Sequence, residues 1–261
     1  MRNKSGIILD LDGVVYEGSD VLPGVLEAIA SLQRRGKRVA YLTNNSAKSA
    51  DQIFEKLSGL GIACERQEVI TASETAASFI ARQQLDGGRG VLVIGTNELK
   101  QALVQAGVGL SDAASCGAVL VGFHPGFSFS MLCDGLDALQ RGVPLIACNR
   151  DANYPGQGGR LLPGCGAIVA ALEAAAQRQT DHDVGKPNTL MFDQLVARLG
   201  LAPEHCVVVG DGLQSDIRMA NAASVASVWI SRGRALPSGV GMPAPDLVAT
   251  DLGVLAALLL A

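Results

Sequence analysis

Short apolar runs alternate with longer helical patterns along most of the chain. Seven runs, each built on about five residues rich in Val, Ile and Leu, have the length and composition of buried strands. They lie at residues 6–12, 38–45, 91–96, 118–123, 144–149, 206–212 and 228–233. The segments between them carry the apolar spacing of amphipathic helices. Several of these segments stop at a glycine, the usual residue just past a helix C-terminus, namely Gly36, Gly107, Gly142 and Gly200. This alternation predicts a parallel sheet covered by helices on both faces.

The composition limits the classes of protein to which the chain can belong. Its 261 residues are enough to bury one large core or two smaller ones. The net charge of −4 argues against a broad basic face for nucleic acid. No apolar run reaches the roughly 18 residues that a membrane span needs, and no signal-peptide pattern follows the first six residues. The six cysteines are scattered, which indicates buried free thiols in a reducing cytosol. We therefore expect a cytoplasmic protein without nucleic-acid or membrane partners.

Polar residues gather at the ends of the predicted strands. Asp10 and Asp12 end the first strand, Thr43 and Asn44 the second, and Asp211 a later one. The carboxyl ends of parallel strands share one edge of the sheet, where α/β proteins bind their ligands. Each residue alone has an ordinary explanation as a turn or helix-capping residue. Together with Lys186, which precedes a predicted helix, they indicate one functional site.

The chemistry of this set points to a phosphoryl group. Asp10, Asp12 and Asp211 offer only oxygen ligands, which suit Mg²⁺ better than Zn²⁺. A cation would also explain why two close carboxylates follow a buried strand, since like charges repel there. Thr43 offers a hydrogen-bond donor and Lys186 a fixed positive charge, and both suit the oxygens of a transferring phosphoryl group. A carboxylate can attack phosphorus directly and form an aspartyl-phosphate intermediate.

Four segments resemble, in order, the four motifs of the haloacid dehalogenase (HAD) superfamily. They are "DLDGVVY", "LTNNS", "VGKPN" and "GDGLQSD". The resemblance is closest to the class IIA branch, with its NagD-type, p-nitrophenyl and phosphoglycolate phosphatases, and it covers nearly the whole chain. It implies a Rossmann-like, doubly wound parallel-sheet core. It also implies a Mg²⁺-dependent phosphatase that hydrolyses a small phosphorylated metabolite, such as a sugar phosphate, a nucleotide or phosphoglycolate.

The resemblance implies a role for each matching residue. Asp10 would be the nucleophile, and Asp12 would first protonate the leaving oxygen and then activate water. Thr43 and Asn44 would bind the phosphoryl group, and Lys186 would bridge that group and the nucleophile. The implied ligands of Mg²⁺ are Asp10, the main-chain carbonyl of Asp12, Asp211 and the nearby Asp216.

The predicted domains follow from a long insertion. About 140 residues separate Thr43 from Lys186, far more than a sheet crossover needs. We expect residues 1–87 and 182–261 to form the catalytic core and residues 88–181 to form an inserted α/β cap domain of the C2 type. In the family such a cap shields the site and selects the substrate. Caps of this branch often dimerise, so the resemblance also suggests a homodimer through the cap.

A loop of the expected cap offers candidates for substrate selection. It spans residues 149–156, after a predicted strand, and contains Asn149, Arg150 and Asp151. We expect Arg150 to pair with a second anionic group and Asp151 to bind sugar hydroxyls. The alternative is an Asx-type turn in which Arg150 is solvated and Asp151 only orders the backbone.

Three other functions share parts of this pattern. A non-catalytic protein that binds phosphorylated metabolites would retain the fold, but here every reacting group is present. A phosphotransferase or phosphomutase fits the motifs, although the insertion comes late in the chain rather than directly after the first motif. A dehalogenase is disfavoured, because that chemistry lacks the acid that Asp12 provides.

Overall fold

The chain folds into two compact units. The computed structural model describes residues 3–155, 160–237 and 239–260. The first unit comprises Met1–Thr43, Ala50–Ile70 and Lys186–Ala261, and the second comprises Asn44–Ser49 and Thr71–Gly185. The second unit is thus inserted into the chain of the first.

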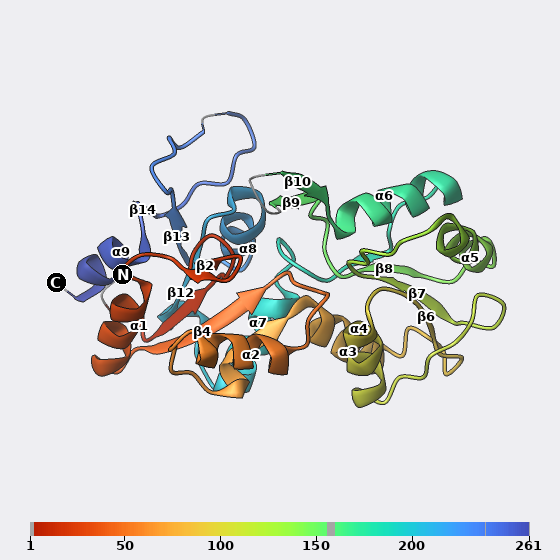
Figure 1. Cartoon of the computed structure of the whole chain (residues 1–261), viewed down its shortest axis with the longest axis horizontal. Helices are drawn as coiled ribbons and strands as arrows, with labels where there is room; N and C mark the ends of the chain where they lie inside the picture. The colour runs from red at the N-terminus through yellow and green to blue at the C-terminus, as the bar shows by residue number, and fades with distance from the viewer. Residues whose placement is uncertain (1–2, 156–159, 238, 261) are drawn as a thin grey trace. The chain divides into compact units, whose positions relative to one another are not determined.

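A six-stranded sheet forms the centre of the first unit (Figure 1). Its order is β14-β13-β12-β1-β4-β5, and the neighbours from β14 to β4 run parallel. The strands are β1 (Gly6–Leu9), β4 (Arg38–Thr43), β5 (Val69–Thr71), β12 (Cys206–Gly210), β13 (Ala226–Ile230) and β14 (Leu247–Ala249). In the central register, Leu9 lies between Tyr41 of β4 and Val209 of β12. The carboxyl ends of β1 and β12 therefore meet at one edge of the sheet.

Helices cover both faces of this sheet. One apolar cluster joins alternate sheet residues, such as Ile7 and Leu9, to residues of α1 (Val25–Arg34), α2 (Ala50–Gly59) and α9 (Leu252–Leu260). Ile8 points to the opposite face, because successive strand residues alternate. The contacts of the sheet with α7 (Leu190–Leu199) and α8 (Arg218–Ala222) complete the doubly wound arrangement. A small hairpin, β2 (Tyr16–Glu17) and β3 (Asp20–Val21), follows β1.

The second unit has a parallel sheet of its own. Its order is β11-β8-β7-β6. The strands are β6 (Val91–Ile94), β7 (Ala118–Val121), β8 (Leu145–Ala147) and β11 (His182–Asp183). The helices α3 (Ala72–Gln83) and α4 (Asn97–Gln105) pack together, as do α5 (Phe129–Gln140) and α6 (Cys165–Ala176), with the sheet between the two pairs (Figure 1). An antiparallel hairpin, β9 (Asn153–Pro155) and β10 (Leu161–Pro163), precedes α6.

The predicted fold class is confirmed. Each of the seven predicted runs overlaps a strand, and the four glycines expected after helices adopt positive φ angles. The units differ from the predicted domain boundaries. The main segment of the second unit begins at Thr71 rather than at residue 88, because it includes α3. It ends at Gly185 rather than at residue 181. That this unit acts as a cap stays a prediction.

The six cysteines are free thiols, and the prediction that all are buried is wrong for two of them. Cys133 is exposed and Cys64 is partly exposed, whereas the other four are buried. Within the described ranges, no helix is both long and apolar enough to cross a membrane.

Candidate active site

A buried lysine joins two of the predicted acidic residues. Lys186 Nζ donates to Asp10 Oδ1 at 2.6 Å and to Asp216 Oδ1 at 2.7 Å, and it lies 3.5 Å from the carbonyl oxygen of Leu42. The side chains of Lys186 and Asp216 are 3% exposed and that of Asp10 is 10% exposed. An ammonium group has three donors and is costly to bury unpaired. These contacts therefore fix Lys186 beside the carboxylate that ends β1.

Asp211 completes an acidic cluster. It directly follows β12, the neighbour of β1 in the sheet. Among the described residues, ligand oxygens of Asp10, Asp211 and Asp216 lie within 4.8 Å of one another. Oxygen donors at this spacing suit a hard cation such as Mg²⁺. The side chain of Asp12 is exposed and is not part of this group. The resemblance assigns only its main-chain carbonyl to the metal.

Two glycines allow the carboxylates to approach the backbone. A Cβ atom on Gly13 would lie 2.7 Å from Asp211 Oδ2, and one on Gly210 would lie 2.2 Å from Asp216 Cβ. Gly13 also has a φ of +85°, a conformation that side chains disfavour. These positions therefore need glycine for space, and Gly13 needs it for its backbone conformation as well.

We expect Gly13→Ala to disturb the acidic cluster. The strain and the clash with Asp211 should lower the free energy of unfolding by about 1–3 kcal/mol and weaken metal binding. Gly18→Ala is a matched control, because Gly18 has a φ of +59° but nothing within 4 Å of the added Cβ. Thermal unfolding with and without Mg²⁺ measures both effects. Equal losses of metal-induced stabilisation in the two variants would contradict the assigned role of Gly13.

Asp211 is held by two residues that the sequence patterns did not indicate. Trp229 Nε1 donates to the carbonyl oxygen of Asp211 at 3.0 Å. Arg234 Nη2 donates to the same carbonyl at 3.1 Å and to Asp211 Oδ2 at 3.2 Å. The Arg234 guanidinium also lies 5.5 Å from the centre of the Trp229 ring. Both residues lie near the carboxyl end of β13, so the strand-end rule that identified Asp211 also applied to them.

Burial changes the protonation equilibria of the site. It raises the pKa of Asp10, and the charges of Asp216 and Asp12 add to this, although Lys186 opposes it. Burial also raises the pKa of Asp211, with Asp216 adding to the effect. For Lys186, burial alone would lower the pKa, but the carboxylates of Asp10 and Asp216 outweigh it and raise the pKa. The lysine thus stays charged, but the three carboxylates outnumber their two cationic partners, Lys186 and Arg234, and a divalent cation would offset the excess negative charge.

The raised pKa values predict pH-dependent metal binding. Asp10 and Asp211 bind protons at higher pH than ordinary carboxyls, so protons should compete with Mg²⁺ as the pH falls. We expect the Mg²⁺ affinity to be lower at pH 5 than at pH 8, because pH 5 is much closer to the pKa values of carboxyl groups. Trp229 is the only tryptophan of the chain, and we expect its fluorescence to change on Mg²⁺ binding because its Nε1 donates to Asp211. An affinity that rises toward pH 5 would contradict this prediction.

The "LTNNS" segment is divided between the two units. Thr43 is buried and ends β4 in the first unit, whereas Asn44 begins the second unit. Asn44 Nδ2 donates to Asp151 Oδ2 at 3.0 Å, and its carbonyl accepts from Asn149 Nδ2 at 2.7 Å. The structure thus brings together Asp10, Lys186, Asp211 and Asp216 in the first unit, and Asn44, Asn149 and Asp151 in the second.

Arg150 and Asn149 make contacts of their own within the predicted loop and its unit. The Arg150 guanidinium pairs with Glu173 at 2.9 Å and with Asp183 at 3.3 Å. Its side chain is still 34% exposed, so that it also binds a second anionic group of a substrate stays a prediction. Asn149 Oδ1 accepts the N–H of Asp151 at 3.0 Å, which is the Asx-type turn of the alternative interpretation. Gly156, the last residue of the predicted loop, lies outside the described residues.

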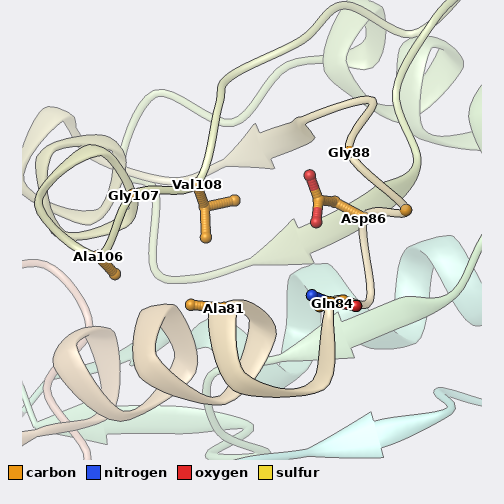
Figure 2. Close-up of a pocket in the computed structure, with 8 residues that line it drawn as sticks. Ala81, Gln84, Asp86, Gly88, Ala106, Gly107 and Val108 are labelled. Carbon is orange, nitrogen blue, oxygen red and sulfur yellow. The ribbon is translucent and has the colours of Figure 1, made fainter.

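A hollow of about 610 Å³ lies elsewhere in the second unit (Figure 2). Its lining residues come from the ends of α3 and α4 and the loops that follow them: Ala81, Gln84, Asp86, Gly87, Gly88, Ala106, Gly107 and Val108. Asp86 is the only titratable residue of this lining, and its carboxylate accepts the Gly90 N–H at 3.1 Å. The hollow contains none of the predicted site residues and offers no nucleophile paired with a base.

Comparison with known proteins yields matches along the whole chain. A model described as haloacid dehalogenase-like hydrolase matches residues 7–109, and one described as HAD-hydrolase-like matches residues 183–255. The sugar-phosphatase AraL of Bacillus subtilis is 30% identical over 94% of this chain and 90% of its own length. The glycerol-3-phosphate phosphatase of Gallus gallus is 34% identical over 89% of this chain and 81% of its own length.

Solved structures agree with these relatives. The 4-nitrophenylphosphatase of Thermotoga maritima has a TM-score of 0.90 and 30% identity, with 99% of this chain and 98% of that chain covered. A protein provisionally named nagD has a TM-score of 0.90 and 28% identity, with 98% of this chain and 99% of that chain covered. The motifs, the fold and these similarities together show that the chain belongs to the haloacid dehalogenase-like hydrolases, in their NagD-like class IIA branch.

Proposed function

We propose that this phosphoric monoester hydrolase is a Mg²⁺-dependent phosphatase that acts on a small phosphorylated metabolite through a phosphorylated Asp10. The observation that carries the proposal is the position of Lys186, which is buried between the carboxylates of Asp10 and Asp216. A lysine there can hold a phosphoryl oxygen and the attacking carboxylate in one place.

The acidic cluster would hold the metal ion. Asp10, Asp211 and Asp216 form an oxygen-only set, and their charge and burial fit Mg²⁺. When bound, the ion supplies positive charge that shields the phosphoryl oxygens and the nucleophile from mutual repulsion. Arg234 and Trp229 hold Asp211 in position.

The chain's own residues then divide the reaction into two steps. In the first, an oxygen of Asp10 forms a bond to phosphorus while the bond from phosphorus to the leaving oxygen breaks, and Asp12 gives that oxygen a proton. In the second, Asp12 takes a proton from water, whose oxygen displaces Asp10 from phosphorus. Lys186, Thr43 and Asn44 bind the phosphoryl oxygens and stabilise their negative charge in both steps.

The substrate class is supported by the relatives. Two of them are named for sugar phosphates and for glycerol 3-phosphate, both small monoesters. We propose a substrate of the same chemical class, with the second unit acting as the cap that selects among its members. A homodimer through this unit is also a proposal, which sedimentation analysis of the full chain tests.

A substrate screen tests this function. The purified chain with Mg²⁺ is assayed for phosphate release from sugar phosphates, glycerol phosphate, nucleoside monophosphates, phosphoglycolate and p-nitrophenyl phosphate. The proposal predicts hydrolysis of p-nitrophenyl phosphate and a preference for at least one metabolite. No phosphate release from any of these esters would contradict it.

A further inference from the structure

Residues 44–49 are bound into the second unit by contacts along the segment. The Phe123 N–H donates to Ser46 Oγ at 2.8 Å, and Ser46 is buried. The carbonyl of Ala47 accepts from Thr96 Oγ1 at 3.2 Å, and that of Lys48 accepts from Ser73 Oγ at 3.3 Å. The segment that begins with Asn44 is therefore positioned by residues far from it in the sequence.

Asn44 itself is held at both its side chain and its backbone. Its carboxamide nitrogen donates to Asp151 Oδ2, and its carbonyl accepts from Asn149 Nδ2. A Cβ atom on Gly185 would lie 2.7 Å from Asn44 Oδ1, so the carboxamide also packs closely over that glycine. These contacts fix both ends of the Asn44 side chain.

Asn149 contacts both Asn44 and Asp151. It is buried, and its Oδ1 accepts the N–H of Asp151 while its Nδ2 donates to Asn44. An asparagine can donate and accept at once, whereas an ionised aspartate only accepts. Asp151 therefore selects the orientation in which the nitrogen of Asn44 faces it, and Asn149 fixes the position of Asp151.

We propose that Asn149 and Asp151 are positioning residues for Asn44, rather than contacts that select the leaving group. The inference rests on the proposed function, in which Asn44 contacts the phosphoryl group. A carboxylate placed directly against a phosphoryl dianion would repel it, whereas a carboxylate that orients a carboxamide supports its binding.

Kinetics on two esters distinguish positioning from selection. Asp151→Ala should lower kcat/KM by about tenfold, the effect of one lost hydrogen bond, for both p-nitrophenyl phosphate and glycerol phosphate. Asp151→Asn should retain most of the activity, because its side-chain oxygen can still accept from Asn44. Asn153→Ala, at the exposed first residue of β9, is the matched control and should have no such effect. A loss confined to glycerol phosphate would overturn the proposal.

A double-mutant cycle tests whether Asp151 acts through Asn44. In an Asn44→Ala background, Asp151→Ala should cause little further loss, because the contact is already absent. Thermal unfolding of each variant separates this effect from a general loss of stability. Full additivity of the two losses would overturn the proposal.

A spectroscopic measurement makes the test independent of activity. The side-chain amide signals of Asn44 in a ¹⁵N spectrum of the full chain are identified by their loss in Asn44→Ala. They should shift in Asp151→Ala and stay unchanged in Asn153→Ala. Unchanged signals in Asp151→Ala would overturn the positioning role. If the wild-type chain hydrolyses no ester, the proposed function fails, and this spectrum still decides whether Asp151 positions Asn44.

Discussion

Asp10→Asn is expected to lower kcat for p-nitrophenyl phosphate by about 10⁴-fold or more, in the range found when a catalytic nucleophile is removed. The amide has nearly the shape of the carboxylate but cannot attack phosphorus. Its side-chain oxygen can still accept the hydrogen bond from Lys186, so the buried lysine keeps its contact with residue 10. Steady-state kinetics at saturating Mg²⁺ measure the effect.

The control for this variant is Asp20→Asn. Asp20 is an exposed aspartate of the first unit, in β3, and its substitution should leave kcat unchanged. Circular dichroism and thermal unfolding of both variants show whether the fold is retained. Near-normal turnover by folded Asp10→Asn protein would exclude Asp10 as the nucleophile.

Removal of the metal is expected to have the second large effect. Chelation by excess EDTA should lower activity by about 10³-fold or more, because a metal ion contributes several kcal/mol of charge stabilisation in such sites. Added Mg²⁺ should restore activity. Ca²⁺ should restore little, because it takes more ligands at longer and more variable distances and would misplace the reacting oxygens.

Asp211→Asn tests the metal site by substitution of a proposed ligand. It removes one charge from the cluster but keeps the main-chain carbonyl that Trp229 and Arg234 hold. The variant should need a higher Mg²⁺ concentration for half-maximal activity, whereas Asp20→Asn should not. Undiminished wild-type activity after thorough chelation would rule out the metal requirement.

The fold was largely predictable because its strands are apolar runs with clear boundaries. The missed strands lack this signal, because each has only two or three residues: β2, β3, β5, β9, β10, β11 and β14. The helix α3 follows the capping pattern T-x-x-E of Thr71 and Glu74, and Thr71 Oγ1 accepts the Glu74 N–H. Because α3 packs against α4, it groups with the second unit, and the boundary lies at Thr71 rather than at residue 88.

The candidate site was predictable only where residues follow strands. That rule pointed to Asp10 and Asp211, and the "LTNNS" and "VGKPN" segments added Asn44 and Lys186. It could not reveal that Arg150 is paired with Glu173, because that contact depends on packing between a loop and α6. Nor could it show that Asp151 contacts Asn44, since the two are 107 residues apart in the chain.

Trapping of the phosphorylated chain tests the central claim most directly. The Asp12→Asn variant is mixed with p-nitrophenyl phosphate and Mg²⁺, because it should react at Asp10 but activate water poorly. The reaction is quenched in acid, and the peptides are analysed by mass spectrometry before and after treatment with hydroxylamine, which cleaves acyl phosphates. We predict one phosphoryl group on Asp10 that hydroxylamine removes and that is absent from Asp10→Asn. Turnover with no phosphoryl group on Asp10, or with one on another residue, would contradict the account.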